Sequence, residues 1–146
     1  MEEDKINCCK KQKNGIELIS IKEHLSKAYI DEADNTLLEM LKLEGKWKVI
    51  TGYYACYNAL YSILIKCGIK CEFHSCTIEL MYLFNFDNKE IEFLEKLKND
   101  RIQSQYYLKE KKLEDVNKVK DFILKCKLIL KSLTNNQIED IRNKIK

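Results

Sequence analysis

The sequence predicts an all-α fold, built as an antiparallel up-and-down bundle of about five helices. Three observations support this prediction. The 146 residues include no proline and only four glycines, so the strongest helix breaker is absent and few turns are marked. The hydrophobic fraction of 45% is sufficient for a globular core. Apolar side chains also recur at helical spacing along most of the chain, whereas a β-sandwich or small barrel needs many more turns.

The chain is expected to hold a single domain over residues 16–146, preceded by a flexible arm over residues 1–15. The arm carries charges of both signs and ends in the turn-prone pair Asn14-Gly15. The first helix of the domain is expected over about residues 16–43, where apolar side chains keep a helical spacing.

The segment from Lys46 to Cys67 has the strongest helical pattern in the sequence, and Gly45 supplies a stop for the helix before it. One apolar face consists of Val49, Tyr53, Cys56, Leu60, Ile63 and Cys67. A second stripe beside it consists of Tyr54, Tyr57, Tyr61 and Leu64. Because the segment carries almost no charge, we expect it to be the central and most buried helix.

The tyrosines of this helix have two interpretations. Exposed aromatic rings in a basic groove can stack on the bases of single-stranded nucleic acid. Buried tyrosines instead pack in a core or an oligomer interface, where each hydroxyl needs a partner. The second interpretation is favoured, because no basic residue occurs between Lys48 and Lys66.

The second half of the chain predicts further helices. They are expected over about residues 75–84, 87–108, 113–133 and 138–145. Ser75 is a plausible N-cap of the first of these helices. Asp87 with Glu90 three positions later resembles a capping box and opens the second. Short loops between helices of this length are typical of an antiparallel bundle.

The charge balance limits the classes of function. Lysine and arginine number 26 against 23 aspartate and glutamate, a net charge of +3. A dedicated nucleic-acid-binding surface is usually much more basic, so any RNA contact is expected to be local. No apolar run is long enough to span a membrane, and the polar start lacks a signal-peptide pattern. We therefore expect a cytoplasmic protein.

Seven cysteines, an odd number found mostly in or beside apolar segments, are atypical of a secreted disulfide framework. We interpret them as reduced thiols that act mostly as small core residues, with Cys8 and Cys9 in the arm. The residues with zinc-ligand chemistry that lie close in sequence are Cys67, Cys71, His74 and Cys76. Their spacing is not that of a standard structural site, so no metal or cofactor is predicted.

Arg101 lies among polar residues and is followed by Tyr106 and Tyr107. A guanidinium can hold a phosphate through two parallel hydrogen bonds, and a phenol can donate to or accept from such a ligand. On an uninterrupted helix the five positions from Arg101 to Tyr106 correspond to about 500°, so the two side chains diverge by about 140°. Convergence requires a helix break or a second protomer, and a solvated helix end is the alternative interpretation.

The order of these segments resembles the HEPN domain family, in its small archaeal and bacterial branch. The residues that carry the resemblance are YYACYNAL at 53–60, LIKCGIK at 64–70, His74 at the start of a short helix, and Arg101-x4-Tyr106. The resemblance extends over most of the chain. It implies a bundle of about five helices that forms homodimers, often with a separately encoded minimal nucleotidyltransferase as partner.

The resemblance also implies a function. In such pairs the HEPN protein is frequently a ribonuclease toxin and its partner the antitoxin, while other members bind RNA or nucleotides without known cleavage. The family's nuclease motif is an arginine followed, after four to six residues, by a histidine, and two protomers together line a metal-free cleft. Arg101 matches the arginine, Tyr106 occupies the position of the histidine, and His74 lies in another segment.

Three functions follow as hypotheses. The first is an RNA- or nucleotide-interacting member of a toxin–antitoxin-type pair without efficient catalysis, in which Arg101, Tyr106, Tyr107 and His74 contact the ligand. The second is a metal-independent ribonuclease, with Arg101 stabilising the transition state and His74 or Tyr106 assisting proton transfer. The third is a helical interaction module that docks the nucleotidyltransferase and has no chemistry of its own.

Overall fold

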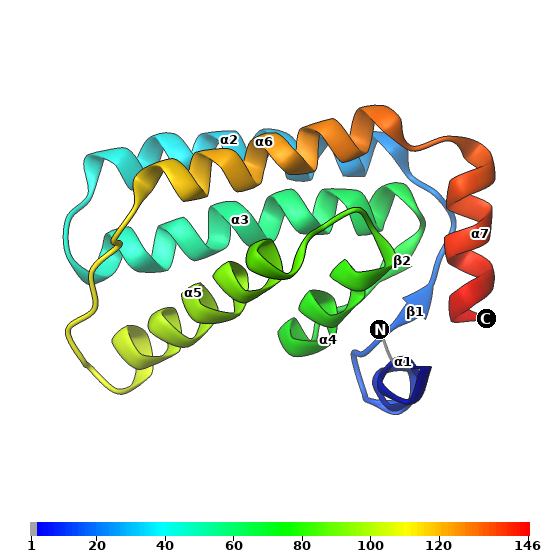
Figure 1. The fold of residues 1–146 in the computed structure, drawn as a ribbon, viewed down its shortest axis with the longest axis horizontal. Helices are drawn as coiled ribbons and strands as arrows, with labels where there is room; N and C mark the ends of the chain where they lie inside the picture. The colour runs from blue at the N-terminus through cyan, green and yellow to red at the C-terminus, as the bar shows by residue number, and fades with distance from the viewer. Residues whose placement is uncertain (1–2) are drawn as a thin grey trace.

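The computed structural model describes residues 3–146, which form an all-α bundle with one very small sheet (Figure 1). The elements are α1 (Glu3–Lys11), β1 (Glu17–Leu18), α2 (Glu23–Lys42), α3 (Lys46–Lys66), β2 (Ile69–Lys70), α4 (His74–Glu79), the 3-10 helix η1 (Leu80–Leu83), α5 (Asn88–Tyr106), α6 (Val116–Ser132) and α7 (Asn135–Ile145). Within this range, no helix combines the length and apolar character needed to cross a bilayer. The predicted fold class is confirmed.

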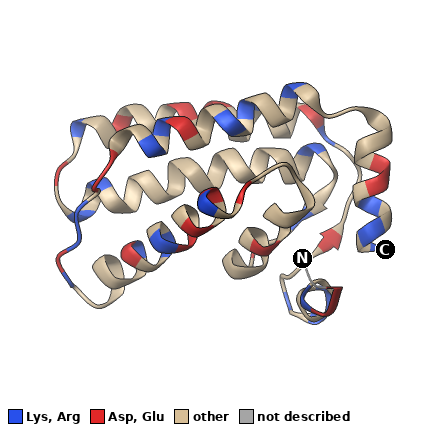
Figure 2. Ribbon diagram, viewed as in Figure 1, with Lys and Arg blue, Asp and Glu red and all other residues tan. Residues whose placement is uncertain are grey.

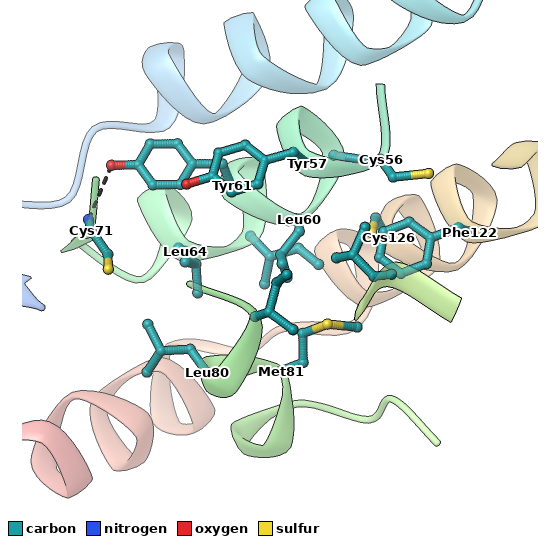
Figure 3. Packing of buried hydrophobic residues seen from close by; sticks show 14 of the residues in the cluster. Cys56, Tyr57, Leu60, Tyr61, Leu64, Cys71, Leu80, Met81, Phe122 and Cys126 are labelled. Atoms are coloured by element: carbon teal, nitrogen blue, oxygen red, sulfur yellow. Dashed lines mark hydrogen bonds between the residues drawn. The ribbon is translucent and has the colours of Figure 1, made fainter. Parts of the chain in front are cut away.

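Helix α3 is the centre of the bundle, as its sequence predicts. It contacts α2, α5 and α6, and Figure 1 shows α5 on the opposite side of α3 from α2 and α6. Charged residues colour the surrounding helices in Figure 2, whereas α3 carries them only near its ends. Leu60 and Leu64 of α3 are fully buried, and Figure 3 shows them with Met81 of η1 and Phe122 of α6. Burial of one such side chain contributes about 2 kcal/mol.

The start of the first predicted helix differs from the sequence prediction. The first helix of the domain begins at Glu23 instead of residue 16, because β1 pairs antiparallel with β2, Glu17 opposite Lys70. Ile19 extends this pairing, since its N–H donates to the Gly68 carbonyl at 2.8 Å. The backbone before α2 is therefore held extended by the chain that leaves α3.

The predicted caps have mixed outcomes. The capping box at the start of α5 is confirmed, with the Glu90 N–H donating to Asp87 Oδ1 at 2.7 Å. The Ser75 cap is wrong: α4 begins at His74 after Phe73, with no side-chain cap, and the predicted helix divides into α4 and η1. Gly45 is the N-cap of α3 with φ of 63°, while α2 has already ended at Lys42.

Much of the predicted flexible arm is helical. Its first two residues, 1 and 2, lie outside the described part, but residues 3–11 form α1. A disulfide between Cys9 and Cys76 fixes α1 to α4, and Ile6 is buried there. The interpretation of all cysteines as reduced thiols is therefore wrong for this pair. It holds for the free thiols buried in the core, namely Cys56, Cys67, Cys71 and Cys126.

The C-terminal helix is fastened by one arginine. Arg142 Nη1 of α7 donates to the carbonyl oxygens of Ile19, Cys67 and Gly68, at 2.9, 2.9 and 3.0 Å. Cys67 and Gly68 end α3, so the cation sits where the negative end of that helix dipole lies. Gly68 has φ of 68°, a left-handed conformation that turns the chain from α3 into β2.

Gly68→Ala is expected to destabilise the protein more than Gly45→Ala, by at least about 2 kcal/mol. Both glycines have positive φ, which costs a non-glycine residue about 1 kcal/mol. A Cβ at position 45 meets open space, whereas a Cβ at position 68 meets the Arg142 guanidinium and lies 2.5 Å from the Ile19 carbonyl oxygen. Urea denaturation of the two variants measures the difference, and equal losses would contradict the role given to this junction.

Candidate functional site

The structure buries Arg101 against the tyrosines of α3. Arg101 is on the face of α5 that packs on α3, and only 6% of it is exposed. Its guanidinium carbon lies 4.8 Å from the ring centre of Tyr53 and 5.5 Å from that of Tyr54. A cation over aromatic faces is stabilised by the ring quadrupoles. Tyr53 is therefore buried as predicted, Tyr54 is partly buried, and the two rings lie beneath the Arg101 guanidinium.

Tyr106 lies near Arg101 without help from a second protomer. Its ring centre is 5.9 Å from the guanidinium carbon. Helix α5 ends at Tyr106, Leu108 has φ of 56°, and the Lys109 N–H donates back to the Gln103 carbonyl at 3.0 Å. All positions from Arg101 to Tyr106 are nevertheless helical, and the chain turns only after Tyr106, so the expectation that convergence requires a helix break or a second protomer is wrong.

His74 belongs to the same group of side chains. Its Nδ1 lies 2.7 Å from the Tyr53 hydroxyl oxygen, and its ring stacks on Tyr57 with centres 4.0 Å apart. Burial, together with the positive charges of Arg101 and Lys98, lowers the pKa of His74 to about 4. The charge of Arg101 therefore acts on His74, and both residues contact Tyr53.

The protonation of this group follows from the pKa shifts. Burial raises the pKa of Tyr53 above its ordinary value of 10, and the Arg101 guanidinium only partly opposes this shift. Tyr53 therefore keeps its proton and His74 is neutral at pH 7. The hydrogen bond between the Tyr53 hydroxyl and His74 Nδ1 therefore joins two neutral groups, and its donor depends on which imidazole nitrogen carries the proton. We call Arg101, Tyr53, Tyr54, His74 and Tyr106 the Arg101 cluster.

Two polar atoms on α5 lack partners within the described part of the chain. They are Nε of Arg101 and Oγ of Ser104, one helical turn apart and both buried. Arg101 Nη1 makes a long hydrogen bond of 3.5 Å to Gln105, and no ion pair among residues 3–146 includes Arg101. The nearest carboxylate in sequence, Asp100, pairs with Lys96 at 2.9 Å. A buried cation without a carboxylate is suited to an anion from outside the chain.

The remaining candidate residues lie outside this group. Tyr107 is two-thirds exposed, and no ring contact of it with Arg101 occurs in the described residues. The zinc-like set is dispersed, since Cys76 is bonded to Cys9, and residues 3–146 bring no three potential ligands together. Burial raises the pKa of Cys67 to about 12, so this thiol is a poor nucleophile.

Sequence reasoning missed Tyr53, Tyr54 and Ser104 as neighbours of the predicted residues. The tyrosines were assigned to the core, which is correct for their burial but omits the cation that one face of the stripe carries. The available signal was an arginine on a largely apolar helix face, opposite a helix without a single carboxylate. Such an arginine has no counter-ion to pack against.

The comparisons with known proteins add no assignment. No protein-family model matches the chain, and no curated protein is significantly similar to it.

The chain has only two arginines, and they are expected to respond oppositely to substitution by methionine. Arg142→Met should lower the free energy of unfolding by about 2 kcal/mol, because three carbonyl oxygens lose their donor. Arg101→Met should leave it unchanged or raise it by up to about 1 kcal/mol, because a buried unpaired charge is removed. Urea denaturation tests both, and an equal loss at Arg101 would make it a structural residue.

His74 is expected to make stability depend on pH between about 4 and 6.5. In this window the unfolded chain binds more protons at His74 than the folded protein does, so stability rises with pH and is lost as pH falls. The variant His74→Gln should lack this component. Denaturant midpoints at half-unit pH steps give the two curves, and parallel curves across the window would show that the pKa is not lowered.

Proposed function

We propose that the protein is a HEPN-like, RNA- or nucleotide-interacting member of a toxin–antitoxin-type pair, in which Arg101 takes a phosphate group of the ligand. The observation that carries this function is the buried guanidinium with its unpaired Nε. Burial of a charge is unfavourable unless the charge is paired. A phosphate oxygen would supply both the missing charge and the missing acceptor.

The surroundings of Arg101 favour an anion. Lys98, which donates to Ser75 at 2.8 Å, adds positive charge close to His74. The Ser104 hydroxyl, on the same face of α5 as Arg101, is a further unused donor. Tyr106 is mostly exposed, so its ring can move to admit a ligand or lie against it. These groups form one small positive site, as expected for a protein whose net charge of only +3 gives no broad basic surface.

Binding is better supported than efficient catalysis. General acid–base chemistry at neutral pH needs a group whose pKa lies near 7. The pKa of His74 is lowered to about 4 and that of Tyr53 is raised, so neither residue exchanges protons readily at pH 7. The cluster can therefore hold a phosphate with fixed donors, while its proton-transfer groups are poorly tuned.

A metal-independent ribonuclease is the second candidate function, favoured by the presence of His74 in the Arg101 cluster. Arg101 would stabilise the charge that develops on the phosphate, and His74 or Tyr106 would assist proton transfer. A bound phosphate would also raise the pKa of His74, because a nearby anion favours the imidazolium. His74 would then become an effective base only after the phosphate of the ligand has bound.

A homodimer and a cytoplasmic nucleotidyltransferase partner belong to the same proposal. Tyr106, Tyr107 and Leu108 are exposed at the end of α5 and would border a cleft shared by two protomers. The third candidate, an interaction module without chemistry, is favoured by exposed Leu124 and Leu128, four positions apart on α6. A small nucleotidyltransferase in the neighbouring reading frame would support the pairing.

Arg101→Met is expected to weaken the binding of fluorescein-labelled tRNA at least about tenfold, a loss of about 1.4 kcal/mol. The matched control is Lys112→Met, which removes the same charge from an exposed position in the loop after α5. It should change the affinity less than about twofold, because a single exposed phosphate contact contributes little. Fluorescence anisotropy at fixed salt measures both, and equal losses would indicate only diffuse electrostatic attraction.

The same proteins distinguish the three functions when they are incubated with tRNA and mixed cellular RNA in EDTA. Cleavage by the wild type that is lost in Arg101→Met would establish the ribonuclease. Binding without cleavage is the expected result. If the protein neither binds nor cleaves RNA, the interaction module remains as its function. A monomeric mass by light scattering at micromolar concentration would contradict the shared cleft.

A further inference from the structure

The disulfide between Cys9 and Cys76 ends beside the Arg101 cluster. Cys76 is the third residue of α4, and His74 is the first. On the other side of Cys76, the Thr77 hydroxyl lies 3.1 Å from the Tyr57 hydroxyl and also donates to the Cys71 carbonyl at 3.2 Å. The covalent link is therefore attached between the two residues by which α4 contacts the tyrosines of α3.

Helix α4 has little else to hold its shape. It has six residues and no side-chain cap at its start. A helix this short is not stable by its own hydrogen bonds. Its position comes from packing of Ile78, from the contacts of His74 and Thr77, from the hydrogen bond that Lys98 donates to Ser75, and from the bond at Cys76.

Helix α1 depends on the same bond. It has nine residues, of which only Ile6 and Cys9 are buried, and it packs against α4. An ion pair of 3.5 Å between the mostly exposed Lys5 and the partly buried Glu79 adds a modest contribution. The covalent bond is therefore a main attachment of α1, together with the hydrogen bond from the Ile16 N–H to the Cys9 carbonyl at 3.0 Å.

We propose that Cys9 and Cys76 are a reversible redox site that controls the placement of His74 in the Arg101 cluster. The oxidant is a low-molecular-weight disulfide. The Cys9 thiolate attacks it and releases one thiol, and Cys76 then attacks the mixed disulfide and releases the second. Two protein S–H bonds are exchanged for one S–S bond, and the small disulfide is reduced to two thiols. The closed bond holds α1 on α4 and His74 on Tyr53.

The open dithiol form loosens α4. A small-molecule thiol reverses the reaction, and it does so slowly because both cysteines are buried in the closed form. Loss of the link lets His74 leave its stack on Tyr57 and gain water, while Arg101 stays on its tyrosines in α3. Ligand affinity then falls without loss of the phosphate-binding residue. Only this effect on affinity rests on the proposed function.

The placement of His74 is measured by NMR titration of its imidazole, with the other histidine assigned by His24→Gln. In protein treated with oxidised glutathione, the pKa of His74 is expected at about 4. After dithiothreitol it should rise by at least one unit toward the ordinary value of 6.5, because burial no longer penalises the imidazolium. Mass spectrometry of alkylated peptides reports whether the pair is bonded in each sample.

Serine variants provide the controls. Cys76→Ser should give the reduced behaviour under both treatments, and Cys9→Ser should agree with it even if Cys76→Ser folds poorly. Cys8→Ser removes the exposed neighbouring thiol of α1 and should keep the full response. A His74 titration curve that is the same in both redox states, or a pair that oxidised glutathione cannot close, would overturn the redox site.

The RNA result is a separate readout. Binding of labelled tRNA is expected to weaken about threefold or more on reduction in the wild type and in Cys8→Ser. If tRNA binds in neither redox state, the proposed function fails, while the shift of the His74 titration still decides the redox site. If tRNA binds equally in both states although His74 shifts, the claimed control of binding is wrong.

Discussion

Helix α3 has no charged residue along its middle, so other elements must shield it from water on every side. The arrangement of the fold follows from this requirement. The tightly buried face of α3 is closed by α2, α5 and α6, with η1 filling the remaining gap through Met81. Tyrosine makes this covering more demanding than leucine would, because each buried hydroxyl needs a partner. The hydroxyls are paired as Tyr53 with His74, Tyr57 with Thr77, and Tyr61 with the backbone N–H of Cys71. These partners belong to α4 and to the residue directly after β2, so the hydroxyls help to hold both segments against α3.

The candidate site is a consequence of that covering. The Tyr53 hydroxyl bonds to His74 of α4, and the face of the same ring contacts Arg101 of α5. The two arginines show how differently one side chain can be used. Arg142 gives its hydrogen bonds to three carbonyl oxygens and completes the fold, whereas Arg101 keeps buried hydrogen-bonding capacity unused. Stability explains the first residue and does not explain the second.

The sequence was sufficient for the features that depend on local patterns. The burial of α3 and the capping box at Asp87 follow from periodicity and spacing, which are encoded within a few residues. Features that depend on partners distant in the chain could not be predicted. The pairing of residues 17–18 with 69–70, the disulfide across 67 positions and the contact of Arg101 with Tyr53 all need the folded arrangement. Arg101 could be selected by chemistry alone, but its burial and missing counter-ion could not.

The Arg101 cluster is assembled from three separate helices, and this has a consequence for the cell that makes the protein. Tyr53 and Tyr54 come from α3, His74 from α4, and Arg101 and Tyr106 from α5. A nascent chain therefore has no such cluster until all of these segments have emerged from the ribosome and α5 has docked on α3. Translation that stops before residue 101 leaves a fragment without the cation, so an incomplete product cannot carry the proposed activity.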